Sequence, residues 1–571
     1  MTVLDFGAVE VHPGGAYTER VHTVVEARDQ RAVDRVGEVT VPEGGELILA
    51  RTVKRGGAVL HAEAPLGDKR TLSLPGLEPG DFAEWEWLRT VPARGPAVPG
   101  FAADPFFFQA DMPLWRSTYV VRAPVAVGLE LDAHHMTAEA PRREGDDLRV
   151  RVTREDVPPR LPEPNAPGDE EALPFVQAGA GPGQEALARA MGDALLDLFR
   201  PTREIAALAE AIRAAVPEGA RREGALVRTA YRRVAKLVQG EGGFDESAGS
   251  ILSRGRGNRT VLLKAVLDAL GVRARLALVR DFRSDPAPYR FPRLDRGAYA
   301  VLRVEQASGA IWLDPTLRET PFGLLPPAVR GMEALVLPEP GEEVVRARTP
   351  VDAGSDRRRT VLQVTVDEGG GAVVEGCDEY LGIEGAALRA GLARIDAAAR
   401  RQAAEQALAR SFRAPSLIEL RVEGEEEPEA PLVVRWRLRV ERWARLEPGR
   451  ALVDTALFPA RLAARFLQLP ERQERLLVAS DERTELEATV RLPAGWRAQA
   501  QPTIDVAGPH GAYRREERAE GNGLVRRDAF QLRAGRIDPS AYATWAAFAR
   551  AVDEAQERPM VFEAPAGMAR R

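Results

Sequence analysis

The first part of the chain alternates apolar and polar residues in a way that predicts one strand after another. In Val125–Leu131 every second residue is a large apolar one, and in Ala83–Trp87 the alanine and both tryptophans share one face against two glutamates. A period of two residues indicates a strand with one buried face. The stretches "VKRGGAVL" and "PGLEPGDF" supply turns between such strands. We therefore predict an antiparallel β-sandwich for residues 1–160.

The middle of the chain changes to a helical period. Apolar residues recur there at intervals of three and four, which places them on one helix face. The positions are Ile205, Leu208, Ile212, Val227, Tyr231, Val234 and Val238. A further amphipathic helix is expected from Asn258 to Leu270, with Asn258 as N-cap and Gly271 beyond its end. The expected strands are Ala274–Val279, Tyr299–Val304 and Ala310–Leu313. Helices followed by strands predict an α+β domain.

The last part returns to the strand period. Leu362–Val366 and Val434–Val440 alternate apolar with polar residues. One long helix is predicted over Ala386–Ser411, and a last helix carries Trp545, Phe548 and Val552 at helical spacing. This pattern predicts a β-rich domain with added helices.

A stretch rich in proline, glycine and acidic residues separates the first two regions and predicts a linker. The expected organisation is a β-sandwich domain at 1–160, a linker at 161–183, an α+β core at 184–338 and a β-rich domain at 339–571. The fold class is therefore multidomain α+β. The glycines of the linker do not form a dinucleotide fingerprint, because no strand is predicted before them and Pro182 interrupts them. We expect no cofactor.

Composition narrows the class of protein. The 571 residues carry a formal net charge of −6, so no basic excess favours nucleic acid as a partner. Cys377 is the single cysteine, which excludes an intrachain disulfide and a cysteine-rich metal site, and we expect no metal. No apolar run approaches the roughly 18 residues of a membrane helix. The N-terminal stretch lacks a basic segment followed by an apolar one, so no signal peptide is predicted.

The stretch "SRGRGNRTVLLKAVLDALGVRARLALV" (residues 253–279) has the form of an active-site mouth: a glycine-containing turn enters a helix, which ends at a glycine and leads into an apolar strand. In many cysteine enzymes the nucleophile lies at such a junction, because the helix N-terminus favours the thiolate. The corresponding positions of this chain hold arginine and asparagine.

The order of helix, strand and a strand ending in "WLDPT" resembles the core of transglutaminase-like (papain-like cysteine) proteins. "GVRAR" (residues 271–275) is similar to the end of the family's nucleophile helix, and "IWLDPT" (residues 311–316) to its aspartate strand. "GGELILARTVKRGGAVL", "GLEPGDFAEWEW" and "DPFFFQADMPLWRS" resemble the domain of unknown function 3857 that precedes the core in a bacterial subset. "GCDEYLGIEGAALR" resembles the start of the β-rich domain that follows it.

The resemblance places the family's catalytic positions on particular residues. The nucleophile position falls on Arg256, with Asn258 where the family usually has aspartate; the histidine position falls on Tyr299, and the third member is kept as Asp314. Acyl transfer needs a nucleophile and a base that titrates near neutral pH. Arginine stays protonated, and tyrosine, with a pKa of about 10, is a poor base. The resemblance therefore implies a degenerate site of Arg256, Asn258, Tyr299 and Asp314, with a binding role in place of a catalytic one.

Residues elsewhere offer little replacement. The chain has no histidine between His135 and His510. His134 and His135 follow a predicted strand, and because adjacent residues in extended chain face opposite sides, they do not suit one metal ion. Cys377 is expected to fill apolar space. The hydroxyls nearest the junction are expected to serve turns and caps; they belong to Ser250, Ser253 and Thr260.

Two functions compete at this point. The first is a catalytically inactive transglutaminase-like protein that binds or scaffolds a protein or peptide partner. The alternative is a remodelled hydrolase or acyltransferase that acts on amide or peptide substrates around Asp314, using Thr260, Ser253 or Tyr299. A lesser third possibility is an envelope assembly or adhesion component whose β-domains carry the function. The family resemblance favours the bacterial cell envelope as the location.

Overall fold

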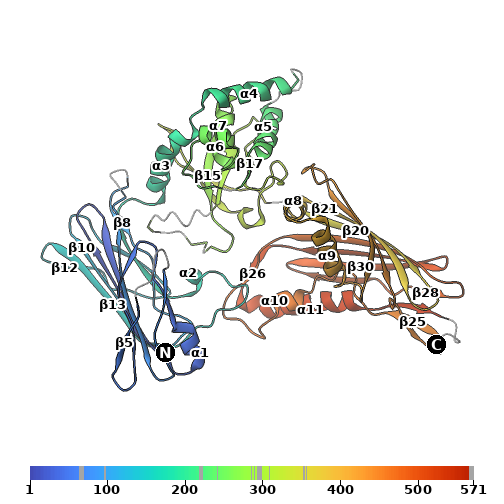
Figure 1. Ribbon diagram of the computed structural model, residues 1–571, viewed down its shortest axis with the longest axis horizontal. Coiled ribbons are helices and arrows are strands. Elements are labelled where there is room, and N and C mark those ends of the chain that lie inside the picture. Colours follow the sequence, from blue (N-terminus) through green and yellow to red (C-terminus); the bar gives the residue numbers. More distant parts are fainter. Residues whose placement is uncertain are drawn as a thin grey trace.

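The computed structural model describes residues 1–63, 70–94, 98–217, 223–240, 242–284, 286–287, 290–291, 299–307, 309–351, 354 and 356–564. The protein is a multidomain α+β molecule, as the sequence predicts. Figure 1 shows the N-terminal sheets on one side, the C-terminal sheets on the other, and a helical middle part above them. Among the described residues, no helix combines the length and the apolar character needed to cross a membrane.

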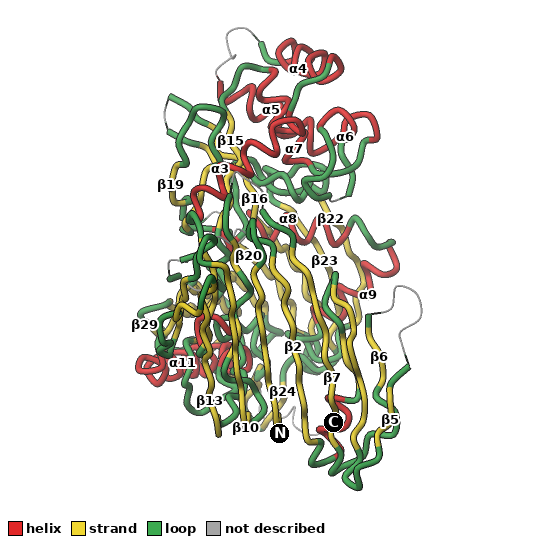
Figure 2. Tube along the Cα trace, turned by 90° about the vertical axis from the view of Figure 1, so that its left-hand side faces the viewer, coloured by secondary structure: helices red, strands yellow, loops and turns green. Residues whose placement is uncertain are grey.

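The N-terminal part is built on one long sheet of eight strands, ordered β12-β13-β10-β1-β2-β7-β4-β5, whose long strands Figure 2 shows side by side. A small sheet of β8, β9, β11 and β14 packs against it, and a third pairs β3 with β6. The strand bounds are β1 Thr2–Val11, β2 Tyr17–Glu26, β3 Glu38–Thr40, β4 Gly45–Val53, β5 Val59–His61, β6 Thr71–Ser73, β7 Phe82–Val91, β8 Phe101–Ala102, β9 Phe106–Phe107, β10 Leu114–Pro124, β11 Glu130–His134, β12 Arg142–Glu144 and β13 Asp147–Val157, with helix α1 at Gln30–Val36.

The pairing of this sheet departs from the predicted antiparallel sandwich at one place. β1 and β10 run parallel, with Phe6 beside Thr118, whereas the other neighbouring pairs are antiparallel. The alternation of a strand shows which residues face inward but not the direction of its neighbour. β1 and β10 lie more than one hundred residues apart, so local pattern did not reveal their relation.

The segment predicted as a linker contains regular structure. It holds α2 (Asp169–Ala172) and β14 (Phe175–Ala180), whose six residues are all buried. β14 pairs with β8, β9 and β11, so a strand does precede the glycines that follow it. Those glycines serve packing: a Cβ on Gly181 would lie 2.1 Å from the carbonyl oxygen of Pro99. We therefore propose that the first domain extends to the end of β14.

The middle part packs helices against one face of a five-stranded antiparallel sheet, ordered β17-β16-β15-β18-β19. The predicted strands at Ala274–Val279 and Tyr299–Val304 are confirmed as β15 and β16. The remaining bounds are α3 Gln184–Leu195, α4 Arg203–Ala215, α5 Glu223–Leu237, α6 Ala248–Arg254, α7 Arg259–Ala269, β17 Ile311–Leu313, β18 Glu333–Val336 and β19 Val345–Arg348.

The C-terminal part holds a second eight-stranded sheet, ordered β22-β23-β21-β20-β27-β31-β30-β29, and smaller sheets of β24-β25-β33-β28 and β26-β32. Its bounds are β20 Arg357–Val366, β21 Ala372–Leu381, α8 Gly382–Leu392, α9 Ala397–Leu408, β22 Ser416–Glu423, β23 Leu432–Val440, β24 Arg445–Glu447, β25 Arg450–Val453, α10 Leu462–Phe466, β26 Leu476–Val478, β27 Glu482–Arg491, β28 Arg497–Gln499, β29 Ile504–Gly508, β30 Gly511–Glu520, β31 Gly523–Leu532, β32 Gly535–Ile537, α11 Tyr542–Glu557 and β33 Met560–Glu563.

The single helix predicted over Ala386–Ser411 is wrong, because the structure divides it into α8 and α9. Asp396 causes the division: its Oδ1 accepts a hydrogen bond from the Ala399 amide at 2.9 Å and so caps a new helix. The last predicted helix is confirmed as α11, with Trp545, Phe548 and Val552 buried.

Candidate functional site

The loop between α6 and α7 holds Arg256 and Asn258. α6 ends at Gly255, whose φ of 64° is left-handed and whose amide donates to the Ile251 carbonyl at 2.9 Å. Gly257 follows with φ of 126°, and a Cβ there would come within 3.0 Å of the Ile251 side chain. Glycine suits both positions, because other residues rarely adopt these angles and this space is small.

Asn258 is the N-cap of α7, as predicted. Its Oδ1 accepts hydrogen bonds from the amides of Thr260 at 2.9 Å and Val261 at 3.4 Å, and its Nδ2 donates to the Gly243 carbonyl at 3.2 Å. Two of the amide donors at the helix N-terminus are therefore hydrogen-bonded to the Asn258 side chain. Those two donors are not available to an oxyanion in this conformation.

Arg256 lies at the surface of this loop. Its side chain is exposed, and its backbone runs beside Gln239, whose carbonyl accepts from the Gly257 amide at 3.3 Å. Within the described residues, no ion pair joins Arg256 to the buried Asp314. The guanidinium is thus placed to meet solvent or a ligand.

Tyr299 and Asp314 belong to neighbouring strands of the sheet. Tyr299 is the first residue of β16 and packs against the cluster that holds Ala277 and Val301, whereas Asp314 follows the end of β17. Asp314 is only 2% exposed, whereas Tyr299 is half-buried. The sheet therefore places Tyr299 at the start of β16 and Asp314 just beyond β17, while Arg256 and Asn258 lie in the loop before α7.

The Asp314 side chain forms a hydrogen bond within the turn that follows β17. Its Oδ1 accepts a hydrogen bond from the Thr316 amide at 2.9 Å, the turn that an aspartate before a proline commonly makes. Burial raises the pKa of Asp314, and hydrogen bonds from Thr316 act against that rise. The carboxylate is therefore held by its own turn.

Two further residues hold this turn, and the sequence interpretation did not include them in the site. The Tyr231 hydroxyl, from α5, donates to the Asp314 carbonyl at 2.8 Å. Arg259, in the first turn of α7, donates to the carbonyls of Thr316 at 2.7 Å and Val238 at 2.9 Å. Both are buried. An arginine among the apolar residues of a helix was the available sequence signal, since a buried guanidinium needs acceptors.

This arrangement limits the chemistry of the site. The Thr260 hydroxyl is buried, and Ser253 is exposed on the last turn of α6. Residues 184–338 contain neither cysteine nor histidine. The usual Cys-His or Ser-His pair of acyl transfer therefore cannot form from residues 184–338 alone.

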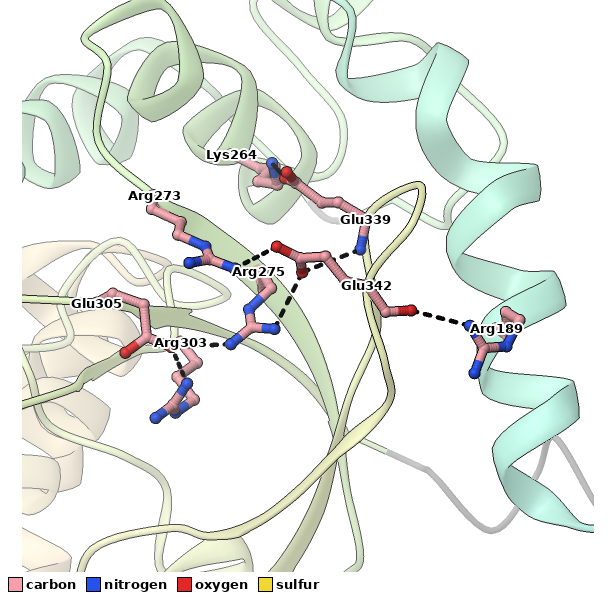
Figure 3. Close-up of polar contacts among 8 residues, drawn as sticks. All are labelled: Arg189, Lys264, Arg273, Arg275, Arg303, Glu305, Glu339 and Glu342. Atoms are coloured by element: carbon pink, nitrogen blue, oxygen red, sulfur yellow. Dashed lines mark hydrogen bonds and ion pairs between the residues drawn. The ribbon is translucent and has the colours of Figure 1, made fainter.

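The arginines of "GVRAR" belong to a network of charges that Figure 3 shows, at the end of β15 and β16 away from Tyr299. Arg275 is buried and donates to Glu305 at 2.9 Å and to Glu342 at 3.1 Å, and Arg273 also pairs with Glu342. Lys264 of α7 binds Asp268 at 2.7 Å, and Glu339 at 3.0 Å. Each cation thus has a carboxylate partner, and the network ties α7 and β15 to the segment after β18.

The other sequence candidates have local partners. His134 pairs with Asp132 at 3.2 Å and stacks on Phe175, and His135 contacts the Glu171 carbonyl at 2.7 Å. Cys377 is half-buried in β21, and burial raises the pKa of its thiol. Among the described residues, no three histidine, cysteine or acidic side chains gather as a metal ion would require.

Comparisons with known proteins show a likeness in fold. Residues 450–562, from β25 to β33, match the model of a domain of unknown function with a solved structure, DUF3858. A crystal structure of a candidate protease from Parabacteroides distasonis is similar over 99% of both chains, with a TM-score of 0.65 and 13% sequence identity. At this identity the likeness concerns the fold alone. No curated protein matches the chain.

A second solved structure, an M1 zinc metallopeptidase from Deinococcus radiodurans, is similar over 32% of this chain and 42% of its own. Its TM-score of 0.20 and identity of 15% are too low to support any conclusion.

Proposed function

We propose that this chain is a catalytically inactive transglutaminase-like protein, preceded by a domain of the 3857 type, that binds a protein or peptide partner. The observation that supports the proposal most is that the Asp314 carboxylate is buried and hydrogen-bonded within its own turn. Asp314 is buried in its own turn, with Arg256 and Tyr299 where the resemblance expects a thiol and an imidazole. Neither side chain supplies the nucleophile or the base of acyl transfer.

A binding role is supported by Arg256. Its guanidinium is exposed on a loop that two glycines and an N-cap hold in shape. Guanidinium groups bind carboxylates through paired, charge-assisted hydrogen bonds. A C-terminal or side-chain carboxylate of a peptide is therefore the proposed ligand group.

A scaffolding role is supported by contacts between the parts. Arg290 of the middle part donates to Glu130 of β11 at 2.9 Å, and Arg232 of α5 donates to Glu429 of the C-terminal part at 2.6 Å. Arg536 of β32 donates to the Phe282 carbonyl at 2.7 Å. Such ties suit a protein that presents several surfaces in a fixed arrangement.

The competing proposal is a remodelled hydrolase or acyltransferase. It is supported by the fold shared with a candidate protease and by the raised pKa of Asp314. A carboxyl group with a raised pKa suits proton transfer. This proposal needs Thr260, Ser253 or Tyr299 to act as nucleophile, and it needs the loop before α7 to release its capped amides.

One experiment separates the two proposals. The full chain is incubated with a fluorescent glutamine-containing peptide that ends in either a free carboxylate or an amide. Polarisation measures binding, and mass spectrometry of the same samples measures hydrolysis or transamidation. We expect binding of the carboxylate form without a change in mass. Arg256→Gln should weaken that binding about tenfold, the worth of a charge-assisted hydrogen bond.

The matched control is Arg203→Gln, an exposed arginine at the start of α4, which should bind as the unmodified chain does. Equal affinity for both peptides would remove the carboxylate role. Turnover of either peptide that is abolished by Asp314→Ala would establish the competing proposal instead.

A further inference from the structure

A separate pocket of about 550 Å³ lies in the C-terminal part, between the sheet and its helices. Strands β20 to β23 form its floor, α8 and α9 one wall, and the loop into α10 the other; Figure 1 shows α8 and α9 beside β20 and β21. Its walls are mainly aliphatic, with Leu388, Leu420, Val422 and Val434 partly exposed. The volume falls within the range of small-molecule sites.

The buried carboxylate in the floor of this pocket, Asp378, has its charge and its hydrogen bonds compensated by neighbouring side chains. Asp378 is 3% exposed and accepts hydrogen bonds from Arg358 at 2.9 Å, Thr360 at 2.5 Å and the Trp436 indole at 2.7 Å. Arg358 also lies over the ring of Phe458, 4.6 Å from its centroid. A buried carboxylate with three donors, one of which is a guanidinium, needs no further partner.

The rim, in contrast, carries an excess of positive charge. Of its arginines, Arg400 pairs with Glu425 and Arg465 pairs with Glu482, at 3.1 and 3.0 Å. Arg410 and Arg461 also line the pocket and are exposed, and within the described residues neither forms an ion pair. Arg461 donates to the Arg410 carbonyl at 3.1 Å, which holds the two residues together. An anion at this edge would meet two guanidinium groups without a competing carboxylate.

The loop that carries Arg461 is held in an uncommon conformation. Phe458 and Arg461 have φ of 49° and 51°, which non-glycine residues rarely adopt. Side chains fix the loop on both sides: Ser411 Oγ accepts from the Phe458 amide at 2.9 Å, and Asp553 of α11 accepts from the Leu462 amide at 2.9 Å. Strained residues held in place by their surroundings are typical of ligand clamps.

We propose that this pocket binds an alkyl carboxylate, with the chain against the aliphatic walls and the carboxylate at Arg410 and Arg461. Burial of the chain supplies affinity, and the two arginines select the anionic group. The proposal does not depend on whether the middle part is catalytic, because the pocket lies in another part of the molecule.

The test is calorimetry of the full chain with decanoate below its micelle-forming concentration, beside decyltrimethylammonium and acetate. Decanoate should bind at one site, while decyltrimethylammonium, with the same chain and opposite charge, and acetate, without the chain, should bind at least tenfold more weakly. The double variant Arg410→Gln/Arg461→Gln should weaken decanoate binding about tenfold or more. Decyl phosphate, a second anion on the same chain, should also bind, because guanidinium groups pair with phosphate as they do with carboxylate.

Two further variants locate the site. Ala407→Trp places a large ring in the pocket from an exposed position of α9 and should abolish decanoate binding while the thermal unfolding midpoint is kept. The control Arg394→Gln/Arg413→Gln removes two exposed charges outside the pocket and should bind decanoate unchanged. Undetectable decanoate binding, equal binding of decyltrimethylammonium, or full binding by Ala407→Trp would each overturn the proposal.

Discussion

Asp314 and Asp378 are both buried carboxylates, yet their neighbours place them in different electrostatic situations. Asp314 accepts from the Thr316 amide within its own turn, and burial raises its pKa. Asp378 accepts from a guanidinium, a hydroxyl and an indole, which together compensate for lost water. The neighbours of a buried carboxylate, rather than burial alone, decide how costly its charge is.

Asp5 provides a pH-dependent prediction at the scale of a residue. Burial raises its pKa to about 6, although Ser117 donates a hydrogen bond to it at 2.8 Å. The folded chain therefore binds more protons than the unfolded chain between about pH 4 and pH 6, so the stability falls as the pH rises through that window. Asp5→Asn should raise the free energy of unfolding at pH 7 by about 1–2 kcal/mol, with little effect at pH 3.5.

Urea unfolding of Asp5→Asn and of the unmodified chain at both pH values measures this difference. Asp147→Asn, in the same sheet, serves as the control, because Asp147 pairs with Arg122 at the surface. An Asp5→Asn variant that is less stable at pH 7 would contradict the assigned direction.

The candidate site was only partly predictable from the sequence at this scale. The resemblance identified Arg256, Asn258, Tyr299 and Asp314, and the N-cap role of Asn258 followed from its type and position. Tyr231 and Arg259 were missed as members of the site. Their acceptors lie 83 and 57 residues away along the chain, and spacing carries no information on such contacts.

At the scale of elements, α7 differs from the amphipathic helix that its sequence predicts. All residues from Arg259 to Leu267 are buried, because helices cover it on one side and the sheet on the other. Lys264 tolerates this burial through its bonds to Asp268 and Glu339. Charged residues on a helix therefore indicate a solvent face only when no partner reaches them.

Replacing either of two glycines in the C-terminal part by alanine should change the free energy of unfolding, in opposite directions for the two positions. Gly376 of β21 lies opposite Trp436, and a Cβ there would come within 2.1 Å of the indole. Gly376→Ala should lower the free energy of unfolding by about 2–3 kcal/mol, because the tryptophan must move. Gly391 of α8 has open space around it, so Gly391→Ala should raise it by about 0.5–1 kcal/mol.

Chemical denaturation of both variants under the same conditions is the measurement. The tryptophan fluorescence of the folded chain should shift in Gly376→Ala alone, because Trp436 must move there. If the two variants had equal stability, the tight contact between β21 and β23 would not be what requires a glycine at position 376.

At the scale of the whole molecule, the segment 160–173 binds the first part to the last. The Asn165 carbonyl accepts from the Leu477 amide at 2.8 Å, and Glu163 accepts from the Gln473 amide at 2.7 Å. Glu171 accepts from Arg475 at 2.8 Å and also pairs with Arg536. A segment whose composition predicts a linker is therefore a docked connection between two sheets.

Glu171→Gln should loosen this connection. The variant removes the charge from two ion pairs whose carboxylate is 10% exposed. Arg536 loses its carboxylate partner, whereas Arg475 keeps its pair with Asp538. Hydrogen exchange of peptides covering 160–173 and 473–478 should accelerate about tenfold, as local opening becomes easier.

Glu139→Gln is the matched control, since its pair with Arg142 is exposed and contributes little. Exchange in the strands β1 and β20 should stay unchanged in both variants. Unchanged exchange at 473–478 in Glu171→Gln would mean that backbone contacts alone hold the segment.

The sequence by itself determined the periods of the strands and helices and the absence of a thiol and an imidazole from residues 184–338. These properties are local, because a period or a residue type is present in the chain before it folds. Only the tertiary structure decided that β1 runs parallel to β10, that Tyr231 and Arg259 hold the turn of Asp314, and that distant arginines share the rim of one pocket. Each of these depends on residues that are brought together by packing, and no local pattern records which surfaces will meet.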